Sequence, residues 1–317
     1  MDVIDEVGEE FVRGLLEARR PDLAGLALRR VGRGWDNELW QLGDELAIRL
    51  PRTERAPDQL RMEHRWLPRF APRLPLAVPT PLDLIDASEL FPQPWTIVAW
   101  VPGDSADKAE AADASSVPLL AEFLRVLHGA ELPVSESHAE PCRVLRDTRC
   151  EFGENLIGAV GEDRARELEK LWRDALSAPE WGGPPVWLHN DLHPANVVVA
   201  GGVLSGIIDF GLLGPGDPAV DLAAAWTLLP SGSATRCLQL YGGVDADTAR
   251  RARGWAVRFG VFVVEMGLNG ERGLAGGKPG WVPVGRRILD RVLEPCEEER
   301  VAGKSLIPNG KGESFGR

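Results

Sequence analysis

One segment near the middle of the chain constrains its fold more than any other. Residues 187–196 read Trp-Leu-His-Asn-Asp-Leu-His-Pro-Ala-Asn, and residues 207–211 read Ile-Ile-Asp-Phe-Gly. Between them, two apolar, β-prone runs at 197–200 and 203–208 flank the dipeptide Gly-Gly, which is typical of a tight hairpin turn. A hairpin of this length would return Asp209 to the neighbourhood of Asn196. The segment therefore predicts a β-hairpin that gathers polar side chains at its open end.

The polar residues of this segment have the order and spacing of a kinase catalytic loop. Asp191 is followed five residues later by Asn196, as in H-x-D-L-x-x-x-N, and Asp209 opens a D-F-G. In such a loop the first Asp accepts or orients the proton of a substrate hydroxyl. Asn196 and Asp209 would hold Mg²⁺ between the phosphates, because a hard cation prefers oxygen ligands. His189 is expected to orient the loop by hydrogen bonding.

A zinc site is the alternative interpretation of the same segment. His189, Asp191 and His193 alternate along an extended stretch, so all three side chains would point to one face. No fourth soft ligand is clustered nearby, and zinc would leave Asn196 and the D-F-G without a role. The sequence therefore favours magnesium.

The N-terminal hundred residues predict a small β-rich lobe. The elements expected are an amphipathic helix at 2–18, strands at 26–31, 38–42 and 45–50, and a helix at 56–70. Arg49 lies on the third strand, where V-A-I-K would put a phosphate-contacting lysine, and Glu63 on the following helix is placed to pair with it. Arginine binds phosphate bidentately, so Arg49 can contact the phosphates in place of that lysine. An Arg49 side chain that points into solvent is the alternative.

Two further segments are candidates for nucleotide contact. Gly32 and Gly34 separate the first two strands and would cover the phosphates, but the G-x-G-x-x-G pattern lacks its third glycine. An ordinary hairpin turn explains these glycines equally well. The apolar run 95–101 predicts a strand that leads into a connector, whose backbone at Ala99 and Val101 would face the adenine edge.

Helical periodicity dominates after residue 105. Helices are expected at 118–132, 162–176, 218–229, 246–268 and 284–299. These patterns predict an α+β, two-lobed fold, with a nucleotide-binding lobe at 1–101 and a larger helical lobe for catalysis and acceptor binding at 102–300. The polar tail 301–317 is expected to be disordered.

The charge of the chain excludes some classes of partner. With a net charge of −12 and a pI near 5.0, the 317-residue chain is not expected to bind nucleic acid or an anionic membrane. The N-terminus lacks a basic start and an apolar core, and no apolar run is long enough to span a membrane. The four cysteines form no C-x-x-C pair, which indicates reduced thiols. We therefore expect a cytoplasmic protein. The sequence carries no signal for its oligomeric state.

These motifs resemble the bacterial aminoglycoside phosphotransferase family, whose catalytic loop reads close to H-G-D-L-H-P-x-N and is followed by I-D-F-G. The resemblance is most specific at 188–197, 207–211 and 216–223, and it extends more weakly over about residues 25–290. Asn190 stands where the family has Gly, and Arg49 where it has Lys. The resemblance implies a protein-kinase-like fold, ATP or GTP as donor with Mg²⁺, and phosphorylation of a hydroxyl on a small molecule.

The segment after the D-F-G disfavours a protein substrate. Only a few residues separate it from Asp217, which leaves no room for an activation loop. Asp217 and Asp221 are expected to cap and brace the helix that follows. Glu265, set in an apolar helix face, is the candidate for holding a substrate ammonium, and pairing with Arg258 or Arg253 is the structural alternative.

Three functions fit these observations. The first is phosphorylation of an antibiotic, with aminoglycosides and macrolides as the obvious classes. The second is phosphorylation of a metabolite hydroxyl, such as that of an amino alcohol or a sugar derivative. The third is a nucleotide-binding pseudokinase, which is disfavoured because Asp191, Asn196 and Asp209 are all present.

Overall fold

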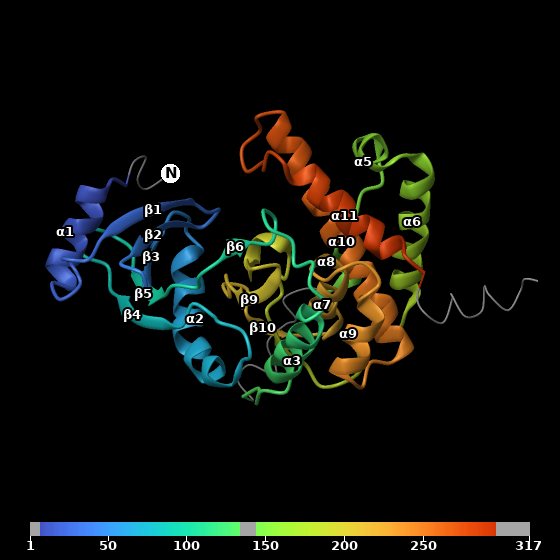
Figure 1. Ribbon diagram of the computed structural model, residues 1–317, viewed down its shortest axis with the longest axis horizontal. Helices are drawn as coiled ribbons and strands as arrows, with labels where there is room; N and C mark the ends of the chain where they lie inside the picture. Colours follow the sequence, from blue (N-terminus) through green and yellow to red (C-terminus); the bar gives the residue numbers. More distant parts are fainter. Residues whose placement is uncertain (1–6, 134–143, 296–317) are drawn as a thin grey trace, which may run out of the picture.

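The N-terminal lobe is built on a five-stranded antiparallel sheet (Figure 1). The computed structural model describes residues 7–133 and 144–295 of the chain. The strands are β1 (Leu28–Arg33), β2 (Asn37–Leu42), β3 (Leu46–Pro51), β4 (Pro81–Ile85) and β5 (Trp95–Ala99), and their order is β1-β2-β3-β5-β4. The three strands predicted before residue 51 are confirmed, with small shifts at their ends.

Burial explains why these segments form strands. Along β2, buried side chains alternate with half-buried ones, which is the pattern of a strand with one face on a core. The central strand β3 is buried along most of its length, and it pairs with β2 on one side and β5 on the other. Helix α1 (Glu9–Arg19) packs Val12, Leu15 and Leu16 into this core. Arg49 therefore extends from the central, mostly buried strand of the sheet.

Helix α2 (Ala56–Phe70) joins the two lobes. It contacts β4 and β5 of the sheet, yet its Trp66 and Phe70 belong to the larger apolar core of the C-terminal lobe. The ring of Trp187 lies 4.9 Å from Trp66 and 5.5 Å from Phe70, measured between centroids. The helix covers the predicted range 56–70 to the residue.

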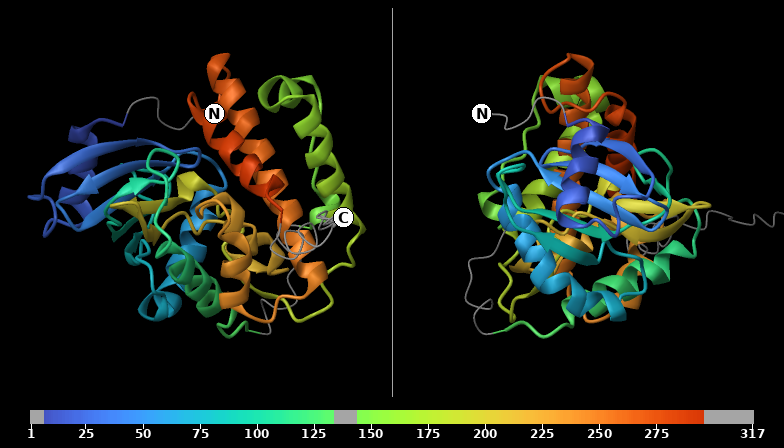
Figure 2. Two further views of the ribbon diagram at one scale, coloured as in Figure 1. Left: turned by 45° about the vertical axis from the view of Figure 1, so that its right-hand side comes forward. Right: turned by 90° about the vertical axis from the view of Figure 1, so that its left-hand side faces the viewer.

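Helices make up most of the C-terminal lobe. They are α3 (Ser116–His128), α5 (Glu154–Val160), α6 (Glu162–Ser177), α7 (Ala219–Leu222), α8 (Ala224–Thr227), α9 (Ala234–Tyr241), α10 (Ala246–Glu271) and α11 (Trp281–Leu293). Helices α10 and α11 pack side by side and are also close to α6 (Figure 2). Single 3₁₀ turns occur at η1 (Ala71–Arg73), η2 (Leu145–Asp147) and η3 (Pro194–Asn196).

Two small sheets lie between the five-stranded sheet and the helices. Strands β8 (Val197–Ala200) and β9 (Val203–Ile207) form the predicted hairpin, and β6 (Asp104–Ser105) adds to its edge. Strand β7 (Val186–Leu188) pairs with β10 (Gly214–Gly216). Since η3 connects directly to β8, the hairpin fixes the position of the segment that contains Asp191 and Asn196.

Several predicted helix boundaries require correction. The range 218–229 is not one helix but two short ones, α7 and α8. Helix α11 begins at Trp281 rather than at Val284, and α1 begins at Glu9. Neither α5 nor α9 was expected. Residues 2–6, 296–299 and the tail 301–317 lie outside the described residues.

Two global expectations concern membranes and thiols. Among the helices of the described residues, none combines the length and the apolar character that crossing a membrane requires. Cys150 and Cys237 are free thiols, and burial raises the pKa of each to about 12. Cys142 and Cys296 lie outside the described residues.

Candidate active site

The β8–β9 hairpin brings Asp209 close to residues 189–196, the predicted catalytic segment, which contains Asp191 and Asn196. Gly201 and Gly202 form the turn with φ values of +58° and +81°, which glycine adopts without the clash that a Cβ would cause. At the open end, the Ile208 amide donates to the Asn196 carbonyl at 2.9 Å. Asp209 follows immediately, so the expected juxtaposition of Asn196 and Asp209 is confirmed.

Asn196 is oriented by Asp191. Its Nδ2 donates to the Asp191 carboxylate oxygen Oδ2 at 3.0 Å and to the Asp191 carbonyl oxygen at 3.0 Å. Because the amide nitrogen faces Asp191, the amide oxygen is directed away from it. The Asp209 side chain is 54 % exposed, so its carboxylate is open to a ligand. Both groups offer the hard oxygen ligands that suit Mg²⁺.

Arg49 forms a buried ion pair with Glu63, as predicted. The guanidinium Nη1 contacts Glu63 Oε2, and Nη2 lies 3.7 Å from Asp209 Oδ1. Burial alone would lower the pKa of Arg49, but the charges of Glu63 and Asp209 outweigh it and raise that pKa above its usual value. At 8 % exposure, Arg49 does not point into solvent. A permanent cation therefore faces Asp209.

Asp221 braces the catalytic segment rather than its own helix. Its carboxylate is fully buried and accepts hydrogen bonds from the backbone amides of His189 at 2.6 Å and Asn190 at 2.9 Å. The expectation that it caps or braces helix 218–229 is therefore wrong. Asp217 does cap this segment, because it accepts from the Ala219 amide at 3.0 Å, and it also pairs with Arg251.

A chain of polar groups continues from Asp221 through the buried His128 to the partly buried Tyr241. His128 Nε2 lies 3.3 Å from Asp221 Oδ2, and His128 Nδ1 lies 3.0 Å from the Tyr241 hydroxyl. Burial and the charge of Asp221 raise the pKa of Tyr241 to about 12. Because the Asp221 carboxylate can only accept, His128 Nε2 donates to it. Sequence spacing did not indicate this chain.

His189 holds the catalytic segment against the strand before Asp209, as expected. Its Nδ1 accepts from the Asp191 amide at 3.3 Å, which places the ring proton on Nε2. Nε2 donates to the Ile208 carbonyl at 3.0 Å. Asn190 next to it has φ +68°, and its Nδ2 donates to the Leu212 carbonyl at 2.9 Å. Because asparagine tolerates the left-handed region better than most residues, it replaces glycine here at little cost.

The described residues contain no cluster of three or more His, Cys, Asp and Glu side chains suited to a metal ion. The His189 ring packs against Phe210 at 4.6 Å between centroids, whereas the His193 ring faces Trp281 at 5.7 Å. The zinc alternative is therefore not supported.

The loop between β1 and β2 is a hairpin connection tied to the start of α2. Gly34 donates its amide to the Asn37 carbonyl at 2.9 Å, and Gly32 lies at a β-bulge. Asp36 in this loop forms a bidentate pair with Arg55, with distances of 2.8 Å and 2.9 Å. The hydrogen bond to Asp36 is the main reason that the pKa of Arg55 is raised, with smaller contributions from Asp209 and Asp191. Arg55, which the sequence did not indicate, is thus a second cation near the site.

The first backbone amides of the connector after β5 already donate hydrogen bonds within the lobe. The Ala99 amide donates to the Thr80 carbonyl at 2.9 Å, and the Trp100 amide donates to the Glu45 carbonyl at 2.7 Å. The Ala99 amide is therefore already paired within the lobe. The Val101 side chain packs on β9, where a Cβ added to Gly206 would lie 2.2 Å from Val101 Cγ1.

Glu265 lies on α10, one turn after Phe262, whose ring is 6.2 Å from that of His193. Burial raises the pKa of the half-buried Glu265, and the nearby charge of Arg258 opposes that effect. Arg253 instead donates to the Val292 carbonyl at the end of α11. The charge close to Glu265 is thus that of Arg258, one of the two arginines of the structural alternative.

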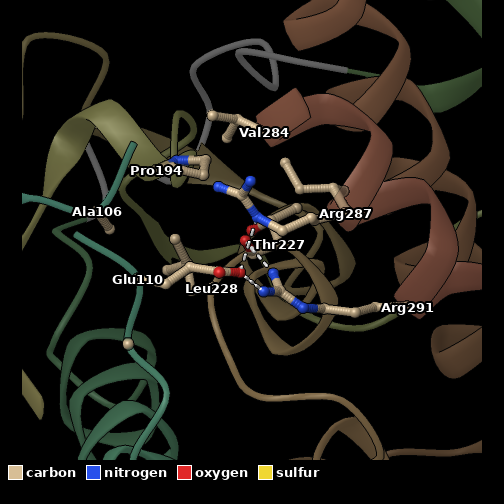
Figure 3. A pocket seen from close by; sticks show the side chains of 10 residues that line it. Ala106, Glu110, Pro194, Thr227, Leu228, Val284, Arg287 and Arg291 are labelled. Atoms are coloured by element: carbon tan, nitrogen blue, oxygen red, sulfur yellow. Dashed lines mark hydrogen bonds and ion pairs between the residues drawn. The ribbon is translucent and has the colours of Figure 1, made fainter. Parts of the chain in front are cut away.

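A small hollow beside Pro194 of the catalytic segment was not anticipated (Figure 3). Pro194 forms part of its wall, and Glu110 reaches toward Arg287 and Arg291 of α11. Glu110 Oε1 contacts Arg291 and lies 3.2 Å from Arg287 Nε. Burial is the main reason that the pKa of Arg291 is lowered. Two cations therefore share one carboxylate there.

Comparison with known proteins identifies relatives of this architecture. The model of the phosphotransferase enzyme family matches residues 27–255. No curated protein sequence matches the chain significantly.

Among solved structures, the chain is similar to macrolide 2'-phosphotransferase MphH from Brachybacterium faecium, with 22 % identity over 89 % of this chain and 97 % of that one and a TM-score of 0.56. It is also similar to a GDP complex of aminoglycoside 2'-phosphotransferase-IIIa, with 18 % identity over 90 % of this chain and 98 % of that one and a TM-score of 0.64. A complex of APH(2")-IIia with GDP and kanamycin gives 19 % identity, 89 % and 97 % coverage and a TM-score of 0.62. These likenesses establish the predicted two-lobed, kinase-like fold.

Proposed function

This chain belongs to the phosphotransferase enzyme family, and on that basis we propose that it transfers the γ-phosphoryl group of ATP or GTP to a hydroxyl of a small-molecule antibiotic, an aminoglycoside or a macrolide. The observation that carries the proposal is the convergence of Asp191, Asn196, Asp209 and Arg49 at the open end of one hairpin. Phosphoryl transfer requires mainly positioning and charge neutralisation, which is what these groups supply.

Asp191 is the proposed catalytic residue. Its carboxylate would accept or orient the proton of the acceptor hydroxyl, and the Asn196 amide at 3.0 Å holds that carboxylate in place. The hydrogen bonds from the His189 and Asn190 amides to Asp221 fix the backbone that carries it. The side chain is therefore positioned before the acceptor arrives.

Asn196 and Asp209 are the proposed magnesium ligands, because the free amide oxygen and the exposed carboxylate fit a hard cation. When bound, Mg²⁺ supplies neutralisation of the charge on the phosphates. Arg49, oriented by Glu63, would contribute a fixed cation to the same phosphates.

The remaining nucleotide and acceptor contacts are proposed from position. The loop with Gly32 and Gly34 would cover the phosphates, and the connector backbone at Ala99 and Val101 would face the base. Glu265 on α10 would hold a substrate ammonium through its half-buried carboxylate. Similar structures that contain GDP, and one with both GDP and kanamycin, support a nucleotide donor.

The test is coupled ATP and GTP turnover against a panel of aminoglycosides, macrolides, amino alcohols and sugar derivatives. We expect an antibiotic to be phosphorylated, and we expect Asp191→Ala to lower kcat at least about 100-fold with little change in nucleotide affinity. Chelation of divalent cations with EDTA should abolish transfer. Turnover that persists in Asp191→Ala, or with excess EDTA, would contradict the assigned roles. Selective turnover of a metabolite alcohol would replace the antibiotic by the alternative acceptor.

A further inference from the structure

Trp35 connects the two lobes through contacts with the C-terminal lobe. It lies in the β1–β2 loop, whose tip points toward the α10–α11 connection (Figure 2). Its indole Nε1 donates to the Gly276 carbonyl at 3.3 Å. The Lys278 ammonium lies 5.5 Å from the ring centroid of Trp35, within the range of a cation–π contact. The loop proposed to cover the phosphates is thus attached to the acceptor side of the molecule.

The indole rests against two aromatic rings of the C-terminal lobe. The ring centroid of Trp35 is 5.9 Å from that of Phe262 and 6.4 Å from that of Trp281, with interplanar angles of 69° and 71°. Both are the edge-to-face geometry that aromatic pairs favour. We call Trp35, Phe262 and Trp281 the aromatic bridge. Trp281 is fixed by a 2.8 Å hydrogen bond from its Nε1 to Asp107, so Trp35 is the member on a loop.

One residue separates the aromatic bridge from the proposed catalytic carboxylate. The His193 ring is 5.7 Å from Trp281 and 6.2 Å from Phe262, and its Nε2 lies 3.4 Å from Asp191 Oδ2. An acceptor hydroxyl has to come within hydrogen-bond distance of Asp191. The rest of the acceptor then lies against the bridge. Trp35 is 37 % exposed, so part of its indole is available for that contact.

We propose that Trp35 is a specificity-determining residue that contacts the acceptor and couples its binding to closure of the nucleotide loop. This inference rests on the proposed function. An acceptor that packs on the indole adds contacts that exist only when the β1–β2 loop is closed. Nucleotide and acceptor then strengthen each other's binding by the same factor, because such coupling is reciprocal.

Hydrogen exchange tests the bridge without any acceptor. In Trp35→Ala, amides at 32–37 and at 272–280 should exchange faster together, because removing the indole frees both ends of the contact. Trp35→Phe keeps a ring and should show a smaller change. Leu90→Ala is the control, since Leu90 is 56 % exposed and lies in the connection between β4 and β5, outside the bridge. Unchanged exchange at 272–280 in Trp35→Ala would overturn the proposal.

Kinetics with the acceptor found in the panel test specificity and coupling. In Trp35→Ala we expect the acceptor KM to rise about tenfold while kcat changes little. In the wild-type protein, acceptor should tighten nucleotide binding at least about fivefold, and the variant should lose this effect. In a Phe262→Leu background, Trp35→Ala should raise the acceptor KM by a smaller factor than it does in the wild-type protein, because the two rings are in contact.

The outcomes separate the inference from the proposed function. Phosphotransfer with an unchanged acceptor KM, or with the same coupling in Trp35→Ala, would overturn the inference and leave the function intact. Exchange that depends on Trp35 in a protein that phosphorylates no member of the panel would overturn the proposed function and the acceptor role with it. The lobe contact itself would then stand as a purely structural feature.

Discussion

At the scale of single residues, the buried pair of Arg49 and Glu63 has the largest electrostatic consequence. Glu63 is 1 % exposed, and burial raises its pKa, while the attraction of Arg49 lowers it. Removal of Arg49 would leave a buried carboxylate without its cation. Breaking one side of such a pair costs about 3–5 kcal/mol of unfolding free energy.

The cost of Arg49→Ala should depend on pH. Without Arg49, the pKa of Glu63 rises further, because burial and the charge of Asp209 both favour the protonated form. Between the unfolded and folded pKa values, the folded state then binds more protons than the unfolded one, so stability falls as pH rises. Urea unfolding should show a smaller loss at pH 5 than at pH 8. Arg49→Lys keeps the cation and is the control. Equal losses for Arg49→Ala at both pH values would show that Glu63 is not the cause.

Residue chemistry that depends on local spacing was predictable here, and chemistry that depends on distant contacts was not. The positions of Asp191, Asn196 and Asp209 follow from one hairpin, so the sequence placed them together. Asp221 lies in a short helix, and its hydrogen bonds to His189 and Asn190 bridge segments that no local pattern connects. A cap was therefore the natural but wrong interpretation.

At the scale of elements, the catalytic segment is held by Asp221. Asparagine at this position would keep the shape but present an NH₂ group to backbone N–H donors, so Asp221→Asn should cost about 1.5–3 kcal/mol of unfolding free energy. Because the segment then loses its fixed position, kcat should fall by up to about 100-fold with nucleotide affinity nearly unchanged.

Asp217→Asn is the matched control for this prediction. Asp217 is also hydrogen-bonded and paired, but with Ala219 and Arg251 rather than with the catalytic segment. Its replacement should lower stability and leave kcat close to that of the wild-type protein. The measurements are urea unfolding and steady-state kinetics of both variants. A similar drop in kcat for the two would mean that Asp221 acts only through general stability.

Long elements with a single strong period were predicted well, and short ones were not. The range 56–70 was found to the residue because its apolar face repeats over several turns. Helices α7 and α8 contain four residues each, and α5 contains seven, so none offers a full periodic pattern. Strands β7 and β10 have three residues each, and their pairing is a tertiary contact that the local sequence does not encode.

At the scale of the whole molecule, α2 determines how strongly the lobes depend on each other. Through Glu63 it is paired with β3, and through Trp66 and Phe70 it is packed on Trp187 in the core of the other lobe. Unfolding of either lobe therefore removes contacts that hold α2, and α2 also packs on the other lobe. This arrangement predicts that the described domain unfolds as one unit.

Thermal unfolding with and without magnesium nucleotide tests this prediction. One transition is expected, and nucleotide at 100 times its Kd should stabilise all of it by about 2.7 kcal/mol. Trp66→Ala should separate the transition into two steps, of which nucleotide shifts mainly the one that unfolds the N-terminal lobe. Trp172→Ala is the control, because Trp172 is buried in the same core but lies on α6. Its loss should lower the free energy of unfolding by a comparable amount, about 3–5 kcal/mol, and the transition should stay single. Two steps in the wild-type protein, or the same single step in both variants, would show that α2 does not couple the lobes.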